Sequence, residues 1–468
     1  MGELVLHNTR TRRKERFEAQ EPGHVRMYTC GPTVYSAQHV GNLRSQLMAD
    51  LARRTFLLEG YRVTHAINIT DVGHLTSDAD TGEDKMERAA AAAGRTAAEI
   101  AAHYTELWLN DRERVGCLAP EVLCKASEHI PEQIELARRL EEKGYTYRID
   151  DGIYFDISKF PSYADFARLD MAGQEGGARI GDVEGKRNGA DFALWKFAPP
   201  GVTRQQEWDS HWGRGFPGWH LECSAMGIRY LGTSFDVHTG GVDLIPVHHT
   251  NEIAQSECAH DVHPWVRFWL HNEFLDFRGE KMSKSTGNVC LLDDLERQGV
   301  PPRAYRYFFL QAHYRQQQAF TDDAIEAAAT GYERLLGQAT ELRQAPGEAD
   351  PARLEPLRQR FRDALCDDLN APRALAVAWE VVRHGELAPA ERWALLREFD
   401  AALGLDLERA LPRTSLQESD PRVYALVARR EEARRSRDFA EADRIRDELA
   451  AEGILLEDTP EGPRWRRK

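Results

Sequence analysis

The 468-residue sequence predicts an α/β protein, in which an insertion interrupts a parallel sheet and a helical region follows. Residues 25–71 read as strand, turn, helix and strand, and such a βαβ unit implies parallel neighbouring strands. Residues 145–205 differ in character, with short strand-like pieces, glycine clusters and a charged loop. SFDVHTGG, residues 234–241, then returns to an apolar strand followed by a small-residue turn.

The expected elements follow in order along the chain. VRMYTCGPTVY, residues 25–35, is a strand that runs into a Gly-Pro turn. Residues 43–60 are a helical run closed by Gly60, and residues 61–71 alternate as the next strand. We expect further helices over 86–114, 131–143 and 248–260, a strand over 266–277, and helices from 313 to 405. After a linker over 410–421, the tail reads as two helices and a hairpin.

Composition narrows the class of protein. Hydrophobic residues make up 42% and charged residues 29%, as in ordinary globular proteins. No stretch reaches the roughly 18 to 20 apolar residues that span a bilayer, and the polar N-terminus lacks a secretory signal. Seven scattered cysteines favour a reducing compartment, so we expect a cytoplasmic protein with no membrane contact. The net charge of −15 argues against non-specific coating of nucleic acid.

The stretch from Gly218 to Glu252 carries a candidate metal-ligand set. Cys223, His248 and Glu252 all lie in it, and the last two are four residues apart, so on a helix they share one face. Thiolate, imidazole and carboxylate together suit zinc. Cys30 is the best candidate for a fourth ligand, because a strand could carry it to the same point. The alternative is that the cysteines are small hydrophobic residues and the histidine is structural.

Three short motifs suit a nucleotide. Gly240-Gly241-Val242-Asp243 is a small-residue turn that allows close approach, followed by an acid that could accept ribose hydroxyls. HVGN, residues 39–42, lies at a strand-to-helix turn, where backbone N–H groups favour phosphate. KMSKS, residues 281–285, offers ammonium groups that could neutralise triphosphate charge. Each motif alone is weak, since such runs are most often solvated loops.

In this order, on either side of an insertion, the motifs resemble those of class I aminoacyl-tRNA synthetases, and specifically the cysteinyl-tRNA synthetase family. The resemblance is carried nearly from end to end by YTCGPTVY, INITDV, DFALWK, PGWHLECSAM, GGVDL, HHTNEIAQSECAH, KMSKSTGN and EDTPEGPRWRRK. It implies a Rossmann-type parallel-sheet catalytic domain split by a connective insertion, then a helical bundle and a small C-terminal anticodon-binding domain. We expect the catalytic halves at 1–144 and 206–312, the insertion at 145–205, the bundle at 313–409 and the last domain at 420–468.

The resemblance also implies roles for single residues. The zinc ligands of the family, one ion per chain, match Cys30, Cys223, His248 and Glu252. The amino-acid site matches Trp219, which packs beside the substrate, with Thr70 and Gly31. The nucleotide contacts match Gly41, Gly240, Gly241, Asp243 and Lys284, with the aspartate on the ribose. The groups that stabilise the developing pyrophosphate match His39, Asn42, Lys281 and Lys284.

Two positions depart from the family. HVGN stands where the class usually has HIGH, so Asn42 replaces a histidine, although its amide keeps N–H donors for a phosphate oxygen. Thr250 stands where many relatives have Glu, which removes a negative charge near Glu252 but not the ligand itself. Both changes could tune affinity without changing the function.

The implied reaction has two steps. ATP, with Mg²⁺, activates L-cysteine to cysteinyl-adenylate, and tRNA(Cys) then accepts the cysteinyl group. Zinc would select cysteine by binding its thiolate, because the serine hydroxyl is a poorer ligand and a pocket cannot exclude a smaller isostere. We expect a monomer. The alternatives are the ATP-dependent cysteine ligase of mycothiol biosynthesis, which shares the catalytic core, and an inactive paralogue that binds RNA.

Two basic stretches in the tail suit an unstacked RNA loop such as an anticodon. They comprise Arg429, Arg430, Arg434, Arg435 and Arg437, then Arg464, Trp465, Arg466, Arg467 and Lys468. The alternative for these stretches is a solvated helix face and a tail without a partner.

Overall fold

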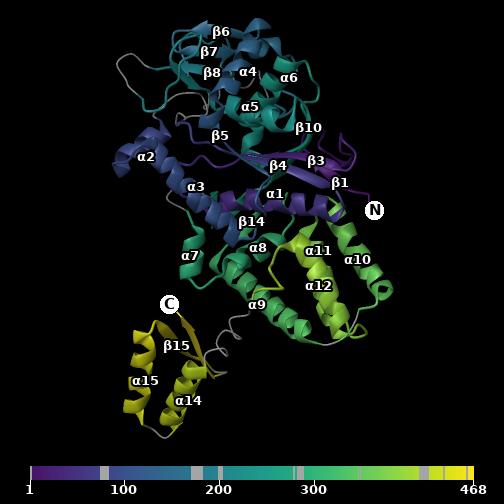
Figure 1. Ribbon diagram of the computed structural model, residues 1–468, viewed down its shortest axis with the longest axis vertical. Helices are drawn as coiled ribbons and strands as arrows, with labels where there is room; N and C mark the ends of the chain where they lie inside the picture. The colour runs from purple at the N-terminus through teal and green to yellow at the C-terminus, as the bar shows by residue number, and fades with distance from the viewer. Residues whose placement is uncertain are drawn as a thin grey trace.

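The computed structural model describes residues 3–73, 84–169, 183–198, 204–277, 280–281, 289–345, 347, 349–410, 421–435, 438–459 and 462–467. A parallel sheet lies at its centre, with the strand order β11-β10-β3-β4-β5 (Figure 1). These strands are β3 (His24–Thr29), β4 (Arg62–Ile69), β5 (Val122–Lys125), β10 (Phe235–Gly241) and β11 (Val266–Asn272). The predicted α/β class with a parallel sheet is confirmed.

Helix α1 (Val40–Leu58) connects β3 to β4 and completes the predicted βαβ unit. It begins before residue 43, where we expected it, because His39 and Asn42 cap its N-terminus reciprocally. The Asn42 backbone N–H donates to His39 Nδ1 at 3.3 Å, and the His39 backbone N–H donates to Asn42 Oδ1 at 3.2 Å. The HVGN motif therefore builds the start of the helix itself.

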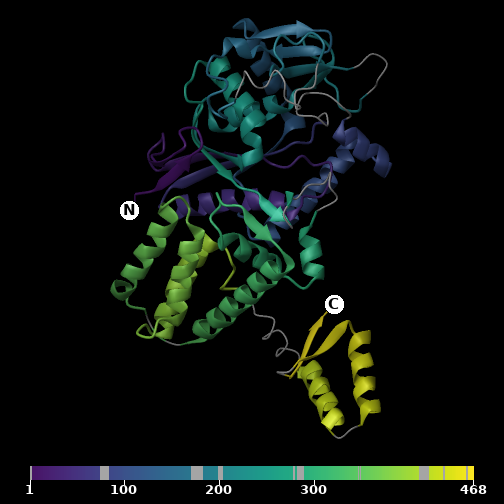
Figure 2. The same cartoon turned by 180° about the vertical axis from the view of Figure 1, so that it is seen from behind.

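The sheet separates two apolar cores, and helices lie on both sides of it in the view from behind (Figure 2). On one face, α1 lies between the sheet and the helical bundle. The other face is covered by α4 (Ile130–Glu142), α5 (Trp219–Leu231) and α6 (Thr250–His260). A smaller third core joins the ends of the sheet to α2 (Lys85–Ala93) and α3 (Ala97–Arg114).

The helical region expected over 86–114 is present as two helices, because the chain breaks between α2 and α3. Gly94 ends α2 with a φ of 61°, in the left-handed region that glycine adopts without strain. Thr96 then starts α3 with a capping box to Glu99. The alanine-rich composition favoured a continuous helix, but a glycine followed by a capping box ends one helix and starts another.

The insertion forms an antiparallel sheet of β6 (Thr146–Ile149), β7 (Gly152–Phe155), β8 (Phe192–Phe197) and β9 (Gly215–Pro217). Strand β9 lies beyond residue 205 and leads directly into α5. Gly218 joins the two, and a Cβ there would lie 1.9 Å from the Ala193 carbonyl oxygen. The insertion therefore fixes the position at which α5, and with it Trp219, enters the catalytic unit.

The bundle consists of α8 (Pro302–Leu310), α9 (Asp322–Gln344), α10 (Pro351–Cys366), α11 (Ala371–Arg383) and α12 (Pro389–Leu403). A buried ion network attaches it to α1. Asp50 pairs with Arg306 at 2.7 Å and with Arg54 at 2.7 Å, and it accepts from the Leu118 backbone N–H. The two arginines lower the pKa of Asp50 well below its usual range, against the effect of burial.

The remaining short elements are β1 (Val5–Asn8), β2 (Arg13–Arg16), β12 (Leu275–Phe277), β13 (Glu280–Lys281), β14 (Gln318–Phe320), α7 (Leu292–Arg297), and the turns η1 (Ala126–His129), η2 (Ile157–Lys159), η4 (Val242–Leu244) and η5 (Ile245–His249). Over the described residues, the structure contains no helix that is both long and apolar enough for a membrane span.

The C-terminal unit confirms the expected two helices and hairpin. It comprises α14 (Pro421–Arg435), α15 (Phe439–Ala451), β15 (Ile454–Thr459) and β16 (Gly462–Arg467), around a small apolar core of its own. The first basic stretch is not wholly available to a partner, because Arg430 is buried and Arg429 pairs with Glu441 at 2.7 Å. Arg437 and Lys468 lie outside the described residues.

Candidate active site and metal centre

A cavity of about 490 Å³ opens at the carboxyl ends of the parallel strands. Cys30 follows β3, Thr70 follows β4, and Gly241 ends β10. The chain continues from β3 towards β4 on one side, while β10 lies on the other side of β3, so the strand order reverses here. Open α/β sheets bind ligands at such a switch point.

The structure brings the four predicted metal ligands together at the base of this cavity. Cys30, Cys223, His248 and Glu252 each offer a donor atom, and the donors all lie within 4.8 Å of one another. The two sulfur atoms are 3.9 Å apart, and His248 Nε2 lies 2.9 Å from Glu252 Oε1. The last two are four residues apart as predicted, although His248 lies in the π-helical turn η5 and Glu252 in the first turn of α6.

The protonation of the cluster is set by burial and by the paired charges. Glu252 and Cys223 raise the pKa of His248 to about 10, although burial alone would lower it. His238 and His248 lower the pKa of Glu252 to about 2, again against burial. Burial and the hydrogen bond to Cys223 raise the pKa of Cys30, which holds the proton that the two sulfurs share. These shifts favour a protonated His248 paired with an ionised Glu252, beside a Cys30 thiol that keeps its proton.

The donor set fits zinc. Two thiolates at a tetrahedral zinc, with bonds of about 2.3 Å, lie about 3.8 Å apart, close to the 3.9 Å between Cys30 and Cys223. Two sulfurs, one imidazole and one carboxylate are also donors that zinc accepts in proteins. Glu252 keeps a second contact, since its Oε2 lies 3.1 Å from His238 Nε2, and such an outer partner orients a ligand carboxylate.

Histidines around this cluster were missed by the sequence reasoning. His238 and His249 form a second possible donor group with Cys30 and Glu252. His249 Nε2 lies 3.4 Å from Cys30 Sγ, and its Nδ1 lies 2.7 Å from His271 Nε2. Burial holds the pKa of His249 and of His271 well below the usual value, so both are neutral. The sequence features that could have indicated His249 and His238 are the doubled histidine in HHTNE and the histidine within SFDVHTGG.

The glycines of the cavity wall are required for close packing. A Cβ on Gly31 would lie 1.5 Å from the Asn68 carbonyl oxygen. On Gly240 it would lie 2.7 Å from His249 Cε1, and on Gly241 it would lie 2.4 Å from Asp243 Oδ1. These glycines bring β3, β10 and η4 against their neighbours, which leaves the Asp243 side chain at the cavity wall.

The start of α1 forms the opposite wall of the cavity. His39, Gly41 and Asn42 all line it, and the helix N-terminus there favours an anion. Because Asn42 Oδ1 accepts from the His39 backbone, its amide nitrogen is the donor end that an incoming phosphate could use.

The predicted amino-acid residues lie between the metal cluster and this wall. Trp219, the first residue of α5, has its ring centroid 4.5 Å from that of His248, at 35°. Gly31 and Thr70 line the same side of the cavity. Of the KMSKS lysines, Lys281 belongs by its backbone to β13, paired with Asp276 of β12, and Lys284 lies outside the described residues.

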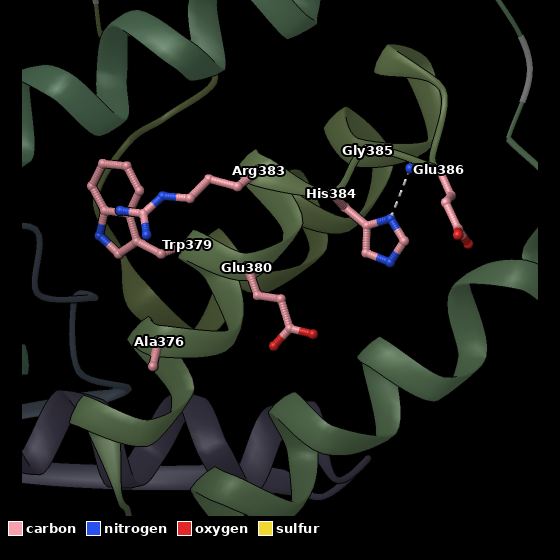
Figure 3. Close-up of a pocket in the computed structure, with 7 residues that line it drawn as sticks. All are labelled: Ala376, Trp379, Glu380, Arg383, His384, Gly385 and Glu386. Carbon is pink, nitrogen blue, oxygen red and sulfur yellow. Dashed lines mark hydrogen bonds between the residues drawn. The ribbon is translucent and has the colours of Figure 1, made fainter.

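A second, more open hollow of about 810 Å³ lies at the C-terminal end of α11 (Figure 3). It is lined by Ala376, Trp379, Glu380, Arg383, His384, Gly385 and Glu386. Its polar groups serve local contacts: the Trp379 Nε1–H donates to Tyr307 Oη at 2.9 Å, and Glu380 pairs with Arg360 at 2.7 Å. Because most of the predicted site residues line the cavity at the carboxyl ends of the strands, that cavity is the candidate active site.

Comparison with known proteins matches this architecture. The tRNA synthetases class I (C) catalytic domain matches residues 16–330, the DALR domain matches 360–408, and the cysteinyl-tRNA ligase anticodon binding domain matches 416–466. The fold is similar to a methionyl-tRNA synthetase of Mycobacterium tuberculosis, with a TM-score of 0.54 and 17% identity over 81% of this chain and 90% of that one. It is also similar to a leucyl-tRNA synthetase of Agrobacterium radiobacter K84, with a TM-score of 0.60 and 14% identity over 84% and 85%. The fold and site thus define a class I aminoacyl-tRNA synthetase.

Relatives similar in sequence indicate which family of class I synthetases the chain belongs to. A cysteine–tRNA ligase of Burkholderia lata is 48% identical over 98% of this chain and 96% of its own length. One from Thermus thermophilus is 42% identical over 99% of both chains. The chain belongs to the cysteinyl-tRNA synthetase family.

Proposed function

We propose that the protein is a cysteine–tRNA ligase, which activates L-cysteine with ATP and transfers it to tRNA(Cys). One observation carries the proposal: Cys30, Cys223 and His248, which cluster with Glu252, line the same cavity as the N-terminus of α1. This arrangement supports a thiol-binding site next to a phosphate-binding site, as the joining of cysteine to ATP requires. Family membership supports the same reaction.

Cys30, Cys223, His248 and Glu252 would hold one zinc ion. When bound, zinc supplies a soft Lewis acid that prefers a thiolate to a hydroxyl, and this preference would select cysteine over serine. The residues of the chain provide the remaining discrimination. Trp219, which lines the cavity beside the cluster, would pack against the substrate, and the backbone at Gly31 would lie close to it.

Adenylate formation needs positioning and charge neutralisation rather than a protein nucleophile. Asp243 would accept the ribose hydroxyls of ATP, close to Gly240 and Gly241. His39, Asn42 and the first N–H groups of α1 would receive the phosphates, with Lys281 and Lys284 at the departing pyrophosphate. Mg²⁺ would bind mostly through the nucleotide.

The C-terminal unit would recognise the anticodon of tRNA(Cys). The match of residues 416–466 to an anticodon binding domain supports this role, and it favours the synthetase over the cysteine ligase of mycothiol biosynthesis, which needs no tRNA. Because the substrate is the tRNA of protein synthesis, we place the reaction in the cytoplasm.

The test is aminoacylation of total tRNA with labelled L-cysteine, with labelled serine as the competitor substrate. We expect ATP-dependent transfer of cysteine to tRNA. Cysteine-dependent ATP–pyrophosphate exchange without tRNA charging, together with ligation to a glucosaminyl-inositol acceptor, would instead support the mycothiol ligase. Absence of exchange would support an inactive paralogue.

A further inference from the structure

We propose that Glu222 is a positioning residue that makes the cavity wall at Thr70 an acceptor for the α-ammonium group of the substrate. Glu222 lies on α5 and is fully buried behind that wall. It has no part in the metal cluster or the nucleotide side described above. The inference rests on the proposed function, because it concerns how that site binds an amino acid.

A directed chain of hydrogen bonds connects Gly31 to Glu222. The Gly31 backbone N–H donates to Asn68 Oδ1 at 2.8 Å. Since a backbone N–H can only donate, this bond fixes the orientation of the Asn68 amide. Its Nδ2 then donates to Thr70 Oγ1 at 3.0 Å, and the Thr70 hydroxyl donates to Glu222 Oε2 at 3.1 Å.

Because of these hydrogen bonds, the Thr70 hydroxyl can accept a hydrogen bond from a ligand but cannot donate one. Its one proton points to Glu222, and one of its two lone pairs receives the Asn68 amide. The Thr70 backbone is also engaged, because its N–H donates to the Pro32 carbonyl at 3.0 Å and its carbonyl accepts from Val34 N–H at 3.2 Å. Among the contacts of the described residues, the second lone pair of Thr70 Oγ1 is the one left for a group in the cavity.

The place and chemistry of this acceptor suit an ammonium group. Thr70 lines the cavity together with Cys30, Cys223 and Trp219, so it belongs to the amino-acid side of the cavity. An ammonium group can only donate, so it suits a hydroxyl whose one proton is already committed to Glu222 and which can only accept. A Thr70 hydroxyl that was free to rotate would be less selective for an ammonium group, because it could also donate a hydrogen bond to other ligands.

Two fragments of cysteine separate this contact from the thiol site. Cysteamine keeps the thiol and the ammonium group but lacks the carboxylate, whereas 3-mercaptopropionate keeps the thiol and the carboxylate but lacks the ammonium. Each is measured as a competitive inhibitor of cysteine-dependent ATP–pyrophosphate exchange, with the full-length, zinc-loaded enzyme. In Glu222→Gln we expect the inhibition constant of cysteamine to rise about tenfold or more, the loss typical of a hydrogen bond supported by charge. The constant for 3-mercaptopropionate should stay within about twofold of wild type, as ordinary surface changes do.

Three further measurements distinguish a positioning role of Glu222 from general damage to the structure by its substitution. Thr70→Val, which removes the hydroxyl at similar volume, should weaken cysteamine at least as much, and the double variant should be no weaker than Thr70→Val, because Glu222 acts through that hydroxyl. The KM for cysteine should rise in each variant with kcat nearly unchanged. Glu257→Gln is the matched control, since Glu257 is an equally buried carboxylate on α6 that pairs with Arg10 at 2.9 Å, and it should leave both constants unchanged.

Defined outcomes would overturn the inference. Equal weakening of both fragments in Glu222→Gln would mean that the residue only supports the pocket, and unchanged constants would mean that it does nothing for recognition. If Glu222→Gln does not fold, an unchanged cysteamine constant in Thr70→Val overturns the inference instead. Failure of the wild-type enzyme to exchange pyrophosphate with cysteine would refute the proposed function, a result that is separate from all of these.

Discussion

Zinc entering the cluster must displace protons, and the structure sets how many. His248, with a pKa of about 10, carries a proton at pH 7. Cys30 carries a second, because burial and Cys223 raise its pKa. The hydrogen bond from Cys30 lowers the pKa of Cys223, so this thiol gives up its proton more readily than an ordinary cysteine. Zinc binding should therefore release about two to three protons, since only the deprotonated forms are ligands.

The number of protons released determines how steeply the zinc affinity depends on pH. Removing the proton from His248 at pH 7, three units below its pKa of about 10, costs about 4 kcal/mol. Because protons leave as zinc binds, the affinity must rise with pH, by about 100- to 1,000-fold for each unit near pH 7. Competition with a chromophoric chelator between about pH 6.5 and 8 gives this slope directly.

A variant and a control make the reasoning refutable. His248→Asn should lower the slope by about one proton, because the amide has no proton to lose. Cys117→Ser, which changes a thiol outside the cluster, should leave the slope unchanged. A slope of about one or less in the wild type, or an unchanged slope in His248→Asn, would show that the histidine is not held as an imidazolium by Glu252.

Three other outcomes are expected. Asp50→Asn should lower the free energy of unfolding in urea by about 3–5 kcal/mol, because it leaves the buried Arg306 without its carboxylate partner. Since the pKa of Asp50 is lower in the folded than in the unfolded protein, this contribution is present at neutral pH and is lost as the pH falls below the pKa of the unfolded protein. An unfolding midpoint like that of wild type would show that the network does not stabilise the fold. Lys284→Ala should slow pyrophosphate exchange far more than it weakens cysteine binding, whereas exchange at the wild-type rate would remove this lysine from the mechanism. Truncation before Pro421 should preserve exchange and impair charging of tRNA, and full charging by the truncated chain would argue against anticodon recognition by the C-terminal unit.

The fold class was predictable because its signals are local. Alternation over 61–71 and the helical run before it specify strand and helix, and together they imply a parallel pair. The break at Gly94 was missed because alanine-rich residues on both sides favour helix, and only the capping box of Thr96 marks the new start. The burial of Arg430 was also missed, since an arginine-rich helix suggests a solvated face until its packing partner is known.

The site was predictable to the extent that its chemistry lies in the residue types. Cys30, Cys223, His248 and Glu252 were chosen as soft or borderline donors, and the structure brings them within contact of one another. The second donor group could not be foreseen, because His238 on β10 and Glu252 on α6 come together only in the folded chain. The chain from Gly31 to Glu222 was equally hidden, since it joins three segments that are distant in sequence.

Helix α1 has a consequence for how distant parts of the molecule communicate. His39 caps its N-terminus and lines the candidate cavity, and Asp50 and Arg54 further along it contact the bundle. With 19 residues, the helix is a stiff rod about 28 Å long. Under the proposed function, we expect a displacement of α8 or α12 to reach the ATP site through this one helix, without passing through a loop.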